Sequence, residues 1–166
     1  MNKQDFLARR KYFSMVHGVT VRAIGSFSDE ELDYRPRADM RTPRELVFHI
    51  YSQERVLAEA ARAGRFTMEA ANRTNPEDKA GAAEMKTLVT VGDARRYAQA
   101  SHEAAEKIFN EMSEDDLARP VESPMGTYPA WQYFVFAYDE HWHHRGQLYT
   151  YLRLLGKEPP MLYDYQ

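Results

Sequence analysis

The sequence predicts an all-α protein, an antiparallel four-helix bundle with one long crossover connection. Three observations lead to this prediction. Helix-forming residues such as alanine, glutamate and leucine are abundant, and continuous β-branched runs are missing. Four long segments carry apolar residues at helical spacing and end at recognisable stop signals. One stretch between them, residues 65–86, has few large apolar side chains and is long enough to cross the bundle.

The first predicted helix extends from Lys3 to Ile24, where Gly25 follows as a stop signal. Its apolar stripe includes Phe6 and Phe13. A short capped turn is expected at residues 28–32, because a serine and a glutamate stand there at the spacing of a capping box. Residues 34–41 contain a proline and are predicted to form a connector.

The second predicted helix has a clear start. Thr42 is the expected N-cap, Pro43 takes the first helical position, and Glu45 completes a capping box. Gly64 ends the helix. Residues 65–86 are predicted to form a long loop or frayed crossover, which is also where a lid would lie.

The third predicted helix covers residues 91–112 and is followed by a short turn at 113–116. Prolines and a glycine are frequent in residues 120–129, which predicts a loop. A fourth helix begins at residues 127–128 and reaches Leu155, before a glycine and a proline pair that prevent its continuation.

Composition limits the functions open to this chain. It has 166 residues, no cysteine and a formal net charge of −3. The length fits a single domain over residues 1–166. The lack of cysteine excludes disulfides, thiolate ligands and a cysteine nucleophile, and it fits a reducing compartment. The near-balanced charge argues against a nucleic-acid partner, and no apolar run predicts a membrane span or a signal peptide. We therefore expect a cytoplasmic protein with a small-molecule substrate.

The chemistry is expected in the fourth helix and the second. Glu140 and His144 are four residues apart, so they share a helix face that is otherwise apolar. Burying both is costly unless they are paired or bind a metal. His49 lies on the apolar face of the second helix and is the natural third ligand. Two imidazoles and a carboxylate with an open fourth position are typical of catalytic zinc, and Ni²⁺ accepts the same ligand types.

Other interpretations of these polar residues stay open. A glutamate and a histidine four apart also form simple surface pairs, and a lone histidine on an apolar face is often a satisfied core residue. His141 is the candidate catalytic residue, as a general base, and the rival for the middle ligand position. Arg145 is the candidate for binding a cofactor at the pocket mouth, with a structural ion pair as the alternative. His17 is expected at the surface or in the core, and His102 on a solvated helix face.

Two segments resemble the DinB/YfiT-like superfamily. The first is His-Arg-Gly-Gln-Leu at residues 144–148, followed by the leucine-rich end of the helix and the proline pair at 159–160. The second is Thr-Pro-Arg-Glu-Leu at residues 42–46 with His49 after it, which is similar to that family's approach to its first ligand histidine. The resemblance covers nearly the whole chain.

This resemblance implies a four-helix bundle that holds one divalent metal ion, with zinc favoured over nickel, through three side chains. Most members use three histidines. His49 and His144 match the first and last positions, whereas Glu140 takes the middle one, an arrangement found in one branch of the superfamily. Homodimers are frequent in the family, so the resemblance also implies a homodimer.

Characterised relatives are thiol-dependent transferases and isomerases. The resemblance therefore implies a metal-dependent S-transferase, in which a low-molecular-weight thiol attacks a small electrophile. The alternatives are a metal-dependent hydrolase and a non-catalytic metal-binding stress-response protein. The sequence does not separate these three functions.

Overall fold

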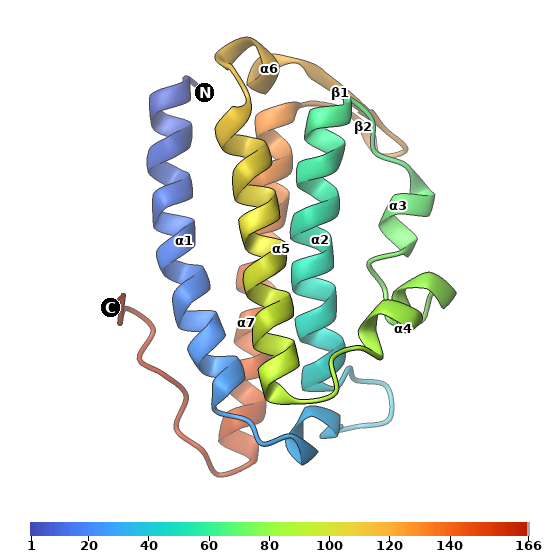
Figure 1. Ribbon diagram of the computed structural model, residues 1–166, viewed down its shortest axis with the longest axis vertical. Coiled ribbons are helices and arrows are strands. Elements are labelled where there is room, and N and C mark those ends of the chain that lie inside the picture. The colour runs from blue at the N-terminus through green and yellow to red at the C-terminus, as the bar shows by residue number, and fades with distance from the viewer. Residues whose placement is uncertain (166) are drawn as a thin grey trace.

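The computed structural model describes residues 1–165 and is mostly helical, as predicted (Figure 1). Its elements, in chain order, are α1 (Lys3–Gly25), a 3₁₀ helix (Glu30–Asp33), α2 (Pro43–Ala63), α3 (Met68–Asn72), α4 (Lys79–Met85), α5 (Val91–Glu111), α6 (Glu114–Ala118), β1 (Pro120–Ser123), β2 (Gly126–Pro129) and α7 (Ala130–Leu154).

The long helices α1, α2, α5 and α7 lie side by side (Figure 1). α1 and α7 run in one direction, and α2 and α5 run in the opposite direction. α2 packs against both α5 and α7, and α1 also contacts both of these helices. The crossover from α2 to α5 passes along the outside of α2 and carries α3 and α4. This arrangement brings side chains of α2 and α7 together although they are far apart in the sequence.

The capping signals act as the sequence predicts. Thr42 and Glu45 form a capping box at the start of α2, and Thr90 and Asp93 form another at the start of α5. Gly64 ends α2 with a φ of 74°, in the left-handed region that favours glycine. The first three long helices therefore begin and end within one residue of the predicted positions.

The crossover is more ordered than the predicted loop. Within residues 65–86 the chain forms α3 and α4, whose N-caps are Thr67 and Asp78. Each helix is too short to show a full apolar stripe, so periodicity gives no sign of it. The prediction of a loop at 65–86 is therefore wrong in this part, and only the capping residues pointed to helices.

The predicted loop at 120–129 is also wrong, because these residues form a β-hairpin. Val121 pairs with Tyr128 in the antiparallel ladder, and Gly126 near the turn has a φ of 122°. The backbone of Glu122 exchanges two further hydrogen bonds with Gly64 and Phe66, which ties the hairpin to the start of the crossover. α7 begins after the hairpin, at Ala130, and not at residues 127–128.

The core consists of two apolar clusters with a polar layer between them. One cluster contains Phe6, Phe13, Leu57, Phe109 and Phe134 among others, and the second contains Ile24, Leu46, Phe48, Leu148 and Leu152 among others. Buried polar side chains separate the two clusters along each long helix. This polar layer comprises His17, Thr20, Ser52, Glu54, Ser101, His102, His141, His144 and Arg145.

Within residues 1–165, none of the helices combines the length and the apolar character needed to span a bilayer.

Candidate metal centre

Three side chains with metal-ligating atoms converge between α2 and α7. They are His49 from α2 and Glu140 and His144 from α7, and one ligand atom from each lies within 4.8 Å of the others. Glu140 Oε2 is 3.2 Å from His144 Nε2 and 3.6 Å from His49 Nε2. The structure thus brings together the three residues that the sequence selected as candidate ligands.

The local sequence explains this convergence. Glu140 and His144 are one helical turn apart, so α7 presents both on the same side. The capping box at Thr42 fixes the start of α2, and His49 follows two turns later on the face that packs against α7. Helix packing then closes the distance between the two elements.

A second set of contacts orients the two imidazoles. His49 Nδ1 is 2.7 Å from the carbonyl oxygen of Thr74, in the crossover. His144 Nδ1 is 2.8 Å from the side-chain oxygen of Gln147. An oxygen of this kind accepts a hydrogen bond, so each Nδ1–H donates and each Nε2 is left as the ligand atom. Partners of this kind are typical of histidines that bind metals.

The electrostatics of the cluster also favour a cation. In the metal-free protein, hydrogen bonds from the Nε2 atoms of His144, and then of His49, hold the pKa of the Glu140 carboxyl well below its ordinary value, so the carboxylate is ionised at neutral pH. A bound cation would take the place of these protons. The two histidines are buried, whereas the Glu140 side chain is 41% exposed. A small ligand can therefore reach the cluster from the side of Glu140.

Gln53 adds one further observation. It lies one turn after His49 on α2, and its buried Oε1 has no hydrogen-bond partner within residues 1–165. A buried acceptor of this kind calls for an explanation, such as a water or a ligand that the protein normally holds. The donor set and this unpaired acceptor together fit a metal centre with a further bound group.

His141 lies apart from the three candidate ligands. Its Nε2 is 2.7 Å from the hydroxyl of Thr20 on α1, and its Nδ1 has no partner among the described residues. Burial holds the pKa of the His141 imidazole well below its ordinary value, so the ring is neutral. The structure therefore places the candidate general base in the polar layer, facing α1, and groups Glu140 with His49 and His144.

Arg145 is also deeply buried, with 2% of its surface exposed. Its guanidinium lies 3.8 Å from the centre of the Trp142 ring, a cation–π contact, and its two terminal nitrogens have no hydrogen-bond partner within residues 1–165. The carboxylate partner considered from the sequence is not among its contacts. The structure therefore places the candidate cofactor-binding arginine under aromatic rings and away from the surface.

Sequence reasoning missed the centre of the polar layer. His102 was expected on a solvated face, but it is 3% exposed and its Nδ1 is 2.6 Å from the carboxylate of Glu54. His17 stacks on His102 with ring centres 3.9 Å apart and also contacts Tyr51 and Gln99. Burial, and then the neighbouring His102, lowers the pKa of His17 to about 3. α5 is covered by both α1 and α2, so His102 is buried although its neighbours in the sequence are polar.

Comparison with known proteins gives a family and a fold. The family model for the DinB superfamily matches residues 12–148. No curated protein gives a match. Among solved structures, a DinB-like protein from Bacillus subtilis is similar, with 21% identity, a TM-score of 0.71, and coverage of 92% of this chain and 95% of that one.

A mycothiol-dependent maleylpyruvate isomerase is similar over 89% of this chain, with 19% identity and a TM-score of 0.69. A histidine-to-alanine mutant of that isomerase is similar with 17% identity and a TM-score of 0.67. This chain spans 63% of the isomerase chain in both cases. At these identities the structural likenesses show the fold.

Proposed function

The chain belongs to the DinB superfamily, and from that premise we propose that it is a divalent-metal-dependent enzyme. The proposed reaction transfers the sulfur of a low-molecular-weight thiol to a small electrophile. The observation that carries the proposal is the convergence of His49, Glu140 and His144 within 4.8 Å. The similar isomerase, which is named for its dependence on a thiol, supports the choice of co-substrate.

The proposal assigns His49 Nε2, Glu140 and His144 Nε2 as the ligands of one Zn²⁺ or Ni²⁺ ion. Two imidazoles and one carboxylate leave a coordination position open, which is typical of catalytic zinc. We also infer that residues 1–166 form one domain, an antiparallel four-helix bundle that acts in the cytoplasm as a homodimer. In such bundles, side chains from facing helices commonly build the metal site.

When bound, the metal ion supplies a Lewis acid that favours the thiolate form of a thiol at neutral pH. The residues of this chain prepare the site for it. Thr74 and Gln147 hold the two imidazoles in the tautomer that directs Nε2 inward. Glu140 stays ionised and contributes negative charge. Since the chain has no cysteine, the reacting thiol has to come from the substrate.

Elemental analysis of the purified protein tests the metal assignment. We expect about one equivalent of zinc or nickel per chain in the parent protein and loss of the metal in His49→Ala, Glu140→Ala and His144→Ala. The control is His143→Ala, because this exposed neighbour on α7 lies outside the cluster and should keep the metal. Circular dichroism confirms that each variant is folded.

The metal-loaded protein is then mixed with a reactive haloarene and either glutathione, bacillithiol or mycothiol. Thiol-dependent loss of the electrophile in the parent protein and in His143→Ala, but not in His144→Ala, supports the transferase. A model ester is tested as a second substrate. Its hydrolysis without any thiol would refute the transferase and support a metal-dependent hydrolase. If the metal-loaded protein turns over neither substrate, the protein binds a metal but lacks the proposed activity. If the parent protein binds no zinc or nickel, the proposed metal site is refuted.

A further inference from the structure

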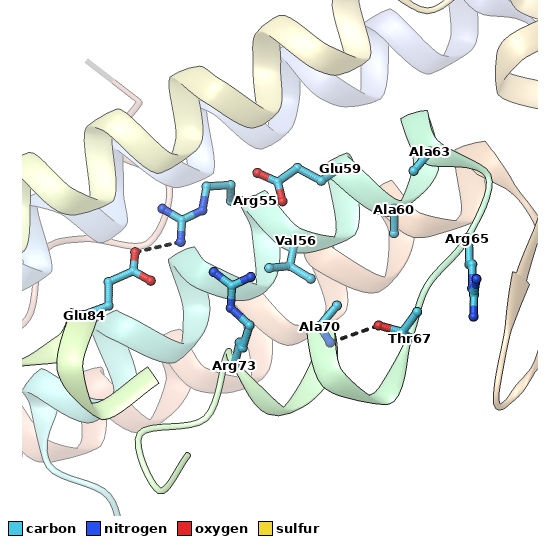
Figure 2. A pocket seen from close by; sticks show the side chains of 10 residues that line it. All are labelled: Arg55, Val56, Glu59, Ala60, Ala63, Arg65, Thr67, Ala70, Arg73 and Glu84. Atoms are coloured by element: carbon cyan, nitrogen blue, oxygen red, sulfur yellow. Dashed lines mark hydrogen bonds and ion pairs between the residues drawn. The ribbon is translucent and has the colours of Figure 1, made fainter. Parts of the chain in front are cut away.

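A separate pocket of about 550 Å³ lies between α2 and the crossover (Figure 2). α2 supplies one side of it, and the segment from Arg65 to Arg73, with Glu84 of α4, supplies the other. The pocket is lined by Arg55, Val56, Glu59, Ala60, Ala63, Arg65, Thr67, Ala70, Arg73 and Glu84. None of the three candidate metal ligands is among them.

The charges in this pocket are unevenly paired. Arg55 forms an ion pair with Glu84 at 2.7 Å. The guanidinium of Arg73 lies close to that of Arg55 in the same part of the pocket (Figure 2), and it has no ion pair or hydrogen bond within residues 1–165. Three arginines face two glutamates, so the pocket has one positive charge in excess, in a chain whose formal net charge is −3. Glu84 pairs with Arg55 and not with Arg73, so the guanidinium of Arg73 is left to pair with a further anion.

Small apolar side chains line part of the rest of the pocket, beside the polar side chains of Glu59, Arg65 and Thr67. Figure 2 shows the short side chains of Ala60, Ala63 and Ala70 toward the end where Arg65 lies. Such side chains leave space for a ligand and offer it apolar contact. The pocket therefore combines the unpaired guanidinium of Arg73 with a strip of small apolar side chains, which suits a small ligand that has one charged group and a short apolar part.

The backbone around the pocket is fixed in place. The Arg65 end is tied to the hairpin through the hydrogen bonds of Glu122 with Phe66 and Gly64. At the Arg73 end, a Cβ on Gly81 would lie 2.2 Å from the carbonyl oxygen of Asn75, so α4 packs closely on this turn. The pocket thus exists before a ligand binds, which lowers the cost of binding.

We propose that this pocket binds a small organic carboxylate, with Arg73 pairing the carboxylate and the alanine-lined surface holding a short apolar body. A single negative charge matches the single positive charge in excess, and a planar carboxylate matches the fork of a guanidinium. The pocket also lies close to the candidate metal centre. Thr74, whose carbonyl holds His49, directly follows Arg73, and Arg55 is about 9 Å along α2 from His49.

The inference does not rest on the proposed function, because the binding can be measured whether or not the protein turns over a thiol. The test is a nuclear magnetic resonance titration of the purified protein with hexanoate, with hexanol and with inorganic phosphate. We expect hexanoate to shift the amide signals of Val56, Ala60 and Ala70 saturably. Hexanol lacks the charge and phosphate lacks the apolar body, so each should bind at least about tenfold more weakly.

Variants locate the site. Arg73→Gln should weaken hexanoate binding about tenfold, because a charge-assisted pair is lost. Glu59→Gln should strengthen it about threefold, because a carboxylate that repels the ligand is removed from the pocket. A variant that merely disturbs the fold would not tighten binding. The matched control is Arg62→Gln, an exposed arginine on the same helix outside the lining, which should bind like the parent protein.

Four results would overturn the proposal. They are the absence of saturable binding by hexanoate, equal affinity in Arg73→Gln and the parent protein, weaker binding in Glu59→Gln, and a loss in Arg62→Gln as large as that in Arg73→Gln.

Discussion

Burial of His17 should make the protein sensitive to mild acid. In the folded protein the pKa of this imidazole is about 3, because burial, and then His102, disfavours its charged form, whereas its ordinary value is 6.5. Below about pH 6.5 the unfolded chain binds a proton at His17 and the folded chain does not. The free energy of unfolding should therefore fall as the pH drops, and this contribution should level off near pH 3.

The size of the effect follows from the same pKa values. Each pH unit between 6.5 and about 3 removes about 1.4 kcal/mol through this one group. At pH 5 the loss from His17 is therefore about 2 kcal/mol. His17→Gln keeps a polar group at the site but removes the titration. The difference in unfolding free energy between pH 7 and pH 5 should be about 2 kcal/mol smaller in this variant than in the parent protein.

Urea unfolding followed by circular dichroism at pH 7, 6 and 5 provides the measurement. Any constant loss of stability in the variant cancels, because only the change with pH is compared. His143→Gln, at an exposed position on α7, is the control and should follow the parent protein. An equal change with pH in the parent protein and in His17→Gln would refute the reasoning.

Three further predictions concern packing. His102→Leu should lower stability by about 3–5 kcal/mol in urea unfolding, because it leaves the buried carboxylate of Glu54 without its partner, and the added substitution Glu54→Gln should restore part of the loss. Gly81→Ala should lower both the melting temperature and the metal content, because the new Cβ would meet the backbone at 2.2 Å beside the turn that supplies the carbonyl for His49. Gly146→Ala should instead raise stability by about 1 kcal/mol in the same unfolding assay, because nothing lies within 4 Å of a Cβ there and alanine favours the helix.

The sequence predicted the long helices well because their ends carry strong local signals. Thr42, Pro43 and Glu45 act within one turn of α2, and Gly64 ends it by adopting a left-handed conformation. The short helices of the crossover and the β-hairpin were missed for the opposite reason. The crossover helices are too short for an apolar stripe and carry only their N-caps as a local signal, and the hairpin is held by contacts with distant residues, such as the hydrogen bonds that join Glu122 to the crossover.

The candidate ligands were found from one helix face and one isolated histidine, and the structure brings the three together. Their supporting contacts were not predictable. The carbonyl that holds His49 belongs to Thr74, in a segment without periodicity. The pairing of Glu54 with His102 joins α2 to α5 and depends on how the helices pack. Spacing within a helix identifies residues that share a face, but it does not identify their partners on another helix.

The candidate ligands come from two helices that are far apart in the sequence but packed together in the fold. This sets the order in which the site can form during biosynthesis. Roughly 90 residues of chain separate His49 from Glu140 and His144, so the three meet only after α7 has been synthesised and has docked on α2. A nascent chain that ends before α7 has one of the three ligands and no site. A metal ion could therefore be held by all three side chains only once α7 has docked, and the exposed side of Glu140 is then the route by which it reaches them. The rate of metal uptake would then depend on access at Glu140.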